Sequence, residues 1–75
     1  MDIADILIHI HPELPAVQRA KIEDELSERD GVVSVHFSPG HPHLLTVAYD
    51  PQTVTAREIL DLVRRWDEAA TMVGL

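Results

Sequence analysis

The chain has 75 residues, no cysteine and a formal net charge of −7. A chain of this length forms one domain, and the missing thiols exclude disulfides and every thiolate metal site. The negative charge argues against nucleic acid or an anionic membrane as the main partner, and no apolar run approaches the roughly 20 residues of a membrane span. We therefore expect one cytoplasmic domain over residues 1–75. Five histidines between residues 9 and 43 are its unusual feature.

The first half of the chain predicts a strand, a helix and a second strand. Residues 3–11 alternate with period two, so three isoleucines share a core face while His9 and His11 share the other. A helix is expected from about Pro15 to Arg29, ended by the glycine at position 31. A second strand is expected over residues 32–38. The core residues expected in this half are Ile6, Ile8, Ile10, Leu14, Ile22, Leu26, Val33, Val35 and Phe37, with Ala16, Val17 and Ala20 widening the helix's apolar surface.

The second half predicts a turn, a strand, a helix and a short last strand. Residues 39–43 contain two prolines and a glycine and indicate a turn, followed by a strand over residues 44–50. Thr55 and Glu58 form a capping-box pattern at the start of a helix from about Ala56 to Asp67. Residues 71–75 are expected to form the fourth strand. The core residues expected here are Leu45, Val47, Tyr49, Ile59, Leu60, Leu62, Val63 and Trp66.

This order of elements predicts an α+β fold. Strand, helix, strand, strand, helix, strand is the ferredoxin-like βαββαβ arrangement. Right-handed crossovers place both helices on one face of an antiparallel sheet, with the strands in the order 4-1-3-2.

The pattern resembles a known family, the heavy-metal-associated domain of copper chaperones and of metal-transporting P-type ATPases. The resemblance implies the same fold over essentially the whole chain and a role in metal binding. Because the matches are mostly core and turn positions, they speak for the fold more than for the activity. The matching stretches are Ile22-x-x-x-Leu26, Asp30-Gly31-Val32-x-x-Val35-x-Phe37, Val47-x-Tyr49-Asp50-Pro51 and Val54-Thr55-x-x-x-Ile59.

The chain departs from this family at the metal-binding motif. The family carries Met-x-Cys-x-x-Cys between its first strand and first helix. Counted back from Asp30 and Gly31, the methionine position falls on Glu13 and the cysteine positions on Pro15 and Gln18. Neither Pro15 nor Gln18 is a soft-metal ligand, so copper(I) thiolate chemistry is excluded.

The expected fold brings four candidate ligands to one end of the sheet. The loop after the first strand carries His11 and Glu13, and the hairpin between the second and third strands carries His41 and His43. Asp67 and Glu68 are expected to join them from the last loop. Imidazole and carboxylate suit zinc, nickel, cobalt, copper(II) or iron. The alternative is that the hairpin is a solvated turn that happens to be rich in histidine.

A second candidate site lies on the face of the sheet that the helices leave uncovered. His9 and His11 on the first strand could bridge one metal ion, with His36 on the second strand as a distant third ligand. The alternative is that they are ordinary surface residues. Leu7, Leu44, Thr46 and Ala48 share this face, and such a mixed face also suits a partner protein or a second copy of the chain.

The sequence thus favours a small metal-binding domain of the metal-chaperone or transporter-accessory type. Its expected partners are a metal ion and a protein such as a metal transporter or a second copy. The alternative is a protein-interaction or regulatory module that has the fold and binds no metal. An enzyme is not expected, because the chain has no cysteine, no serine in a glycine-rich elbow and no phosphate-cradling loop.

Overall fold

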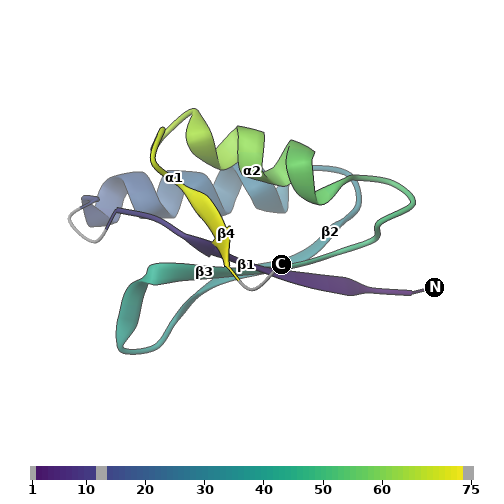
Figure 1. Ribbon diagram of the computed structural model, residues 1–75, viewed down its shortest axis with the longest axis horizontal. Helices are drawn as coiled ribbons and strands as arrows, with labels where there is room; N and C mark the ends of the chain where they lie inside the picture. Colours follow the sequence, from purple (N-terminus) through teal and green to yellow (C-terminus); the bar gives the residue numbers. More distant parts are fainter. Residues whose placement is uncertain (1, 12–13, 74–75) are drawn as a thin grey trace.

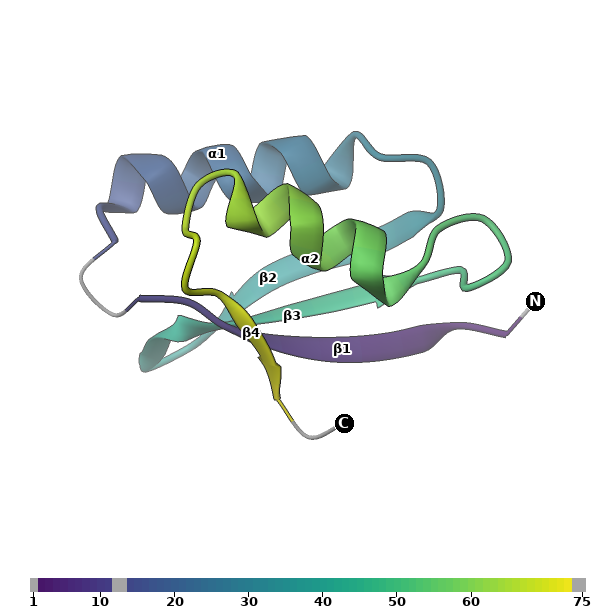
Figure 2. The same cartoon turned by 45° about the horizontal axis from the view of Figure 1, so that its top comes forward.

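The computed structural model describes residues 2–11 and 14–73. Four strands form one antiparallel sheet in the order β2-β3-β1-β4. Both helices lie on one face of this sheet and leave the other face open (Figures 1 and 2). The ferredoxin-like fold and the strand order expected from the sequence are confirmed. The elements are β1 (Ala4–His9), α1 (Ala16–Ser27), β2 (Val32–Ser38), β3 (His41–Tyr49), α2 (Ala56–Arg64) and β4 (Thr71–Val73).

The core lies between the sheet and the two helices. In the two central strands, Ile6 of β1 pairs with Val47 of β3, and Ile8 pairs with Leu45. Burying one such side chain stabilises the fold by about 1.5–3 kcal/mol. Helix α1 contributes two of the buried residues and α2 contributes three. The buried core consists of Ile6, Ile8, Ile10, Ile22, Leu26, Leu45, Val47, Tyr49, Val54, Ile59, Leu60, Val63 and Ala70.

In β2 the expected alternation of inward and outward residues is wrong at its first inward position. Val33 is 59% exposed, although the period-two pattern placed it inward. The pairing of β2 with β3 shifts register between Val32 and Ser34, so one extra residue stands in β2 at this point. Val32 takes the inward place instead, and Val35 and Phe37 pack against the core as expected.

The turn expected over residues 39–43 is also wrong. Only Pro39 and Gly40 connect the strands, because Ser38 already pairs with His41. Gly40 has φ +76°, the left-handed conformation that a two-residue proline–glycine turn requires. Strand β3 therefore begins at His41, and both hairpin histidines belong to a strand.

The remaining differences concern element ends and one helix face. Regular pairing in β1 stops at His9, so His11 lies beyond the strand. Helix α1 begins after Pro15. Helix α2 ends at Arg64, so Trp66 lies in the loop after it. The Trp66 side chain is half-buried there. The expected apolar widening of α1 is wrong: Ala16 and Ala20 are exposed, and so is Val17, at 68%. The last two residues of the expected fourth strand, 74 and 75, lie outside the described residues.

Two turns at the other end of the sheet are closely fitted to each other. Gly31 has φ +93°, and its carbonyl accepts a hydrogen bond of 2.7 Å from the backbone N–H of Asp50. A Cβ at position 31 would lie 2.9 Å from Thr53 Cβ and from Val54 Cγ1. Only glycine therefore fits between α1 and β2 at this point.

The open face is the side of the sheet turned away from the helices. Cross-strand partners share a face, so the register assigns its members. Its centre is apolar, since Leu7 of β1 lies beside Val73 of β4. The open face consists of Asp5, Leu7, His9, Ser34, His36, Leu44, Thr46, Ala48, Thr71 and Val73.

Candidate functional site

Three histidine rings gather where β1 and β3 meet near the hairpin. The ring centroids of His9 and His43 lie 5.2 Å apart with an angle of 65° between the planes. Those of His41 and His43 lie 5.9 Å apart with an angle of 86°. The side chain of His43 is half-buried, whereas His9 and His41 are exposed. The structure thus joins one histidine from the expected open-face site to two from the expected loop site.

The backbone holds these three positions in place. His9 pairs with Leu44 across the β1–β3 ladder, and the N–H of Ile10 donates to the carbonyl of His43 over 2.8 Å. His41 is fixed by its pairing with Ser38 across the two-residue turn. The positions of the three Cα atoms therefore follow from the register of the sheet.

His36 lies apart from this group. Its strand partner is Thr46, which pairs in turn with Leu7, two residues along β1 from His9. Two strand spacings and two residues along a strand separate His36 from His9 by about 12 Å at Cα. Within the described residues His36 makes no ring contact with another histidine.

The backbone of His11 is held by the loop between α2 and β4. Its N–H donates to Asp67 Oδ2 over 2.6 Å, and Asp67 Oδ1 accepts from the N–H of Ala69 over 3.0 Å. Asp67 therefore lies at the expected end of the molecule, where Oδ2 fastens its loop to the β1–α1 connection and Oδ1 accepts a hydrogen bond within its own loop. Glu68 beside it is exposed. Glu13, the other ligand expected in this loop, lies outside the described residues.

The start of α1 offers no replacement for the thiolates of the family. Pro15 caps the helix and carries no ligand atom in its side chain, and Gln18 is half-buried on the first turn. Arg19 also helps to close this region: its guanidinium donates to the carbonyl of Leu14 over 2.6 Å and lies 6.0 Å from the centre of the Phe37 ring. The residues at this position do not fit a soft metal held by sulfur.

No ready-made metal centre is present in residues 2–11 and 14–73. Within those ranges, no three histidine, cysteine, aspartate or glutamate side chains stand in an arrangement that could hold an ion. The three rings of His9, His41 and His43 would have to turn about their side-chain bonds before their nitrogens met at one point.

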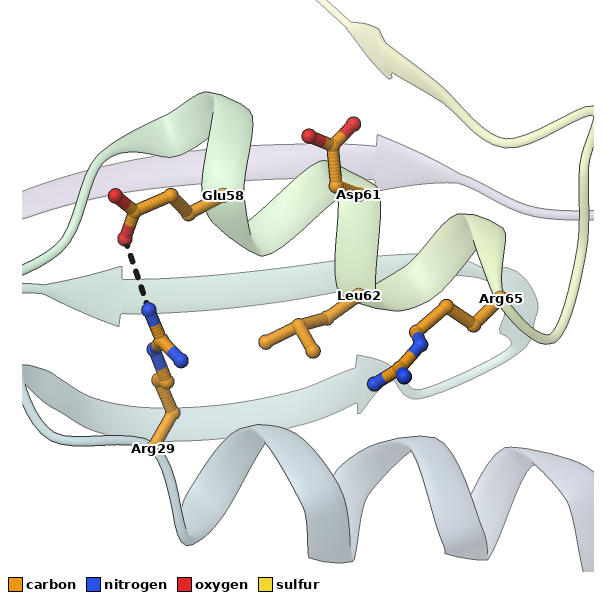
Figure 3. A pocket seen from close by; sticks show the side chains of 5 residues that line it. All are labelled: Arg29, Glu58, Asp61, Leu62 and Arg65. Atoms are coloured by element: carbon orange, nitrogen blue, oxygen red, sulfur yellow. Dashed lines mark hydrogen bonds and ion pairs between the residues drawn. The ribbon is translucent and has the colours of Figure 1, made fainter.

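Another surface feature is a groove lined by residues of α2 and of the segments that follow α1 and α2 (Figure 3). It has a volume of 390 Å³, and no histidine lines it. Its charges are largely paired, as Arg29 contacts Glu58 over 3.1 Å and Asp61 contacts Arg57 over 3.3 Å. The groove has no cluster of unpaired chemistry-bearing groups, and we assign it no function. Its lining residues are Arg29, Glu58, Asp61, Leu62 and Arg65.

Solved structures similar to this one cover nearly the whole chain. Oxidized MerP from Ralstonia metallidurans CH34 matches with a TM-score of 0.81 and 8% identity, over 97% of this chain and 100% of that one. The fold is that of a heavy-metal-associated domain. A copper binding domain from HMA7, a P-type ATPase, matches with a TM-score of 0.77 and 17% identity over 93% of each chain. The CopZ metallochaperone matches with a TM-score of 0.73 and 17% identity, over 93% of this chain and 100% of that one.

The likeness to heavy-metal-associated domains is one of structure. No protein-family model matches the sequence, and no curated protein matches it. At identities of 8–17% the likeness shows the fold alone. In the described residues, no helix has the length and apolar character to cross a membrane.

One signal in the sequence could have located the histidine group. Proline followed by glycine, at positions 39 and 40, is typical of a two-residue turn. A shorter turn would have assigned His41 and His43 to the third strand, next to the first. The clamp formed by Asp67 and the backbone of His11 had no such signal, because it joins positions 56 residues apart.

Proposed function

We propose that this chain is a small metal-binding domain of the metal-chaperone or transporter-accessory type, with imidazole and carboxylate in place of thiolate ligands. The observation that carries the proposal is the group of three imidazoles at the hairpin of a heavy-metal-associated fold. Solved structures with this fold include one named as a metallochaperone and one as the copper binding domain of a P-type ATPase. The candidate ligands are His9, His11, Glu13, His36, His41 and His43.

The ligand types set the class of metal. Neutral imidazole and carboxylate suit zinc, nickel, cobalt, copper(II) or iron(II), while copper(I) prefers sulfur. The net charge of −7 also favours a cation over an anion as the ligand. The proposed partners are therefore one of these metal ions and, for delivery, a metal transporter or a second copy of the chain, in the cytoplasm.

A titration of the whole chain tests the proposal. Zinc, nickel, cobalt and copper(II) are added in turn while NMR follows the imidazole signals. A bound metal shifts or broadens signals from at least two histidines at one saturable stoichiometry. If no histidine signal responds at a tenfold metal excess, the proposal is wrong.

A second candidate function is a protein-interaction module that binds through the open face. The observation favouring it is the apolar centre of that face, where Val73 is 42% exposed beside Leu7. Light scattering on metal-free protein separates the two functions. A metal-free dimer, lost when Val73 is replaced by lysine and unchanged by added zinc, would favour this second function.

A further inference from the structure

We infer that His9, His41 and His43 together bind one divalent transition-metal ion, an inference that rests on the proposed function and names its ligands. Sequence spacing grouped these residues differently, with His9 on the open face and His41 and His43 in a loop with His11 and Glu13. The ring contacts join them instead, through His43 at the centre.

Two of the three ring separations, both measured to His43, are close to those of imidazoles that share a metal. With a zinc–nitrogen bond of 2.0–2.1 Å, the centre of a coordinated imidazole lies about 3.2 Å from the metal, so a tetrahedral angle separates two ring centres by about 5 Å. The centres of His9 and His43 are 5.2 Å apart, and those of His41 and His43 are 5.9 Å apart. Among the described residues the rings of His9 and His41 make no contact with each other, so both must turn before three nitrogens meet at one ion.

The burial of the three side chains fits this adjustment. His43 is half-buried and its carbonyl is bonded to the N–H of Ile10, so it forms the fixed member of the group. His9 and His41 are exposed, so their rings can rotate with no core atoms in the way. A metal ion would order two surface side chains against a third that the fold already holds.

The inferred site supplies three nitrogen ligands and leaves a fourth coordination position open to water or to a partner's ligand. Three protein ligands with a fourth position left to water or another ligand is an arrangement known from catalytic zinc sites. The open position takes water in the isolated domain and a ligand from a partner during transfer. Asp67 is not assigned as a ligand here, since its two oxygens accept backbone hydrogen bonds that hold the carboxylate against its own loop and the β1–α1 connection.

The test compares single histidine variants of the full chain for zinc binding. His9→Gln, His41→Gln and His43→Gln should each lower the affinity by about tenfold or more, since each removes one of three bonds to the metal. His36→Gln and His11→Gln are the matched controls and should change it less than twofold. The backbone N–H of His11, which bonds Asp67, is retained in the glutamine variant. Amide NMR spectra of every variant confirm that the fold is intact.

Cobalt supplies an independent readout of geometry. Bound to three histidines and a water, cobalt(II) should give the intense visible absorption of a four-coordinate ion, and each of the three variants should weaken it. If zinc binds but His36 or His11 proves necessary, or His9 proves dispensable, this ligand set is wrong while the proposed function stands. If the wild-type chain binds none of the metals, both are wrong.

Discussion

The β1–α1 connection and the β2–β3 hairpin lie at the same end of the sheet but differ in what their polar groups contact. The connection from β1 to α1, where the family resemblance places the metal-binding cysteines, is fastened by Asp67 on the His11 backbone and by Arg19 on the Leu14 carbonyl. The hairpin between β2 and β3 lies at the same end (Figures 1 and 2) and carries two histidine rings beside His9. In the first region the polar side chains of Asp67 and Arg19 bond the backbone and hold the fold. In the second region the histidine rings contact one another and are available for a ligand.

On the inferred assignment, the metal would bind away from the position where the family resemblance places its ligands. Binding a soft metal through thiolates would need cysteines at positions 15 and 18, and this chain has Pro15 and Gln18 there. Histidine chemistry is available one strand away, where it requires only that two surface rings turn. The predictions below test this division of tasks by changing one region at a time.

The largest effect is expected from the double variant His41→Gln/His43→Gln. It removes two of three inferred bonds to the metal, so zinc affinity should fall by at least about 100-fold, or about 2.7 kcal/mol. Its urea midpoint should stay close to that of the wild type, because neither side chain belongs to the buried core. Calorimetry measures the affinity. A double variant that binds zinc as the wild type does would rule out the inferred ligand set and leave His9, His11, Glu13 and His36 as candidates.

The next largest effect is expected in the pH dependence of zinc affinity at the histidine group. Imidazole coordinates a metal only when neutral, so zinc affinity should fall by at least about tenfold as the pH is lowered from about 7.5 to 5.5. Metal binding and proton binding oppose each other, so zinc addition at pH 6.5 should release protons. A pH-independent affinity over this range would point to carboxylate ligands alone.

A substitution in the β1–α1 region should lower the stability of the fold and leave the zinc affinity unchanged. Asp67→Ala removes the acceptor of two backbone hydrogen bonds and should lower the free energy of unfolding by about 1.5 kcal/mol. Zinc affinity should change less than twofold. Asp61→Ala is the matched control, since its exposed ion pair with Arg57 is worth about 0.5 kcal/mol or less. Chemical denaturation gives both values, and equal losses in the two variants would contradict the clamp.

The smallest effect concerns the turn that presents His41. Gly40→Ala should cost about 1 kcal/mol of stability, because its φ of +76° is unfavourable for a residue with a Cβ, although the Cβ would meet no atom within 4 Å. Gly31→Ala is the comparison and should cost clearly more, since its Cβ would also meet Thr53 and Val54 at 2.9 Å. Thermal unfolding ranks the two, and the reverse order would show that strain at the hairpin dominates.

The sequence predicted the central part of the fold well. Alternation in β1 and β3 reports burial directly when both strands are regular, as the exposed fractions of Ile8 and Leu45, both 0%, confirm. It failed at Val33, where an extra residue in β2 reverses the alternation. A bulge is set by pairing with a neighbouring strand, and one strand's own pattern does not record it.

The candidate site was less predictable than the fold. The composition marks the histidines as a set, but a turn over residues 39–43 separates His9 from His41 and His43. The grouping of three rings depends on the strand register to within one residue, which the composition of a turn does not determine. The ligand assignment itself stays a prediction until a metal titration is done.

The two glycine turns give the molecule one end that resists alteration and one that accepts it. At Gly31 the turn before β2 is in close contact with Thr53 and Val54 of the β3–α2 connection, so a side chain there would disturb both connections. At Gly40 the surrounding space is empty. The hairpin is consequently a place where residues can be exchanged or inserted without repacking the interior. Residues with donor atoms of a different hardness could be placed there, so that the inferred metal site is altered while the framework is kept.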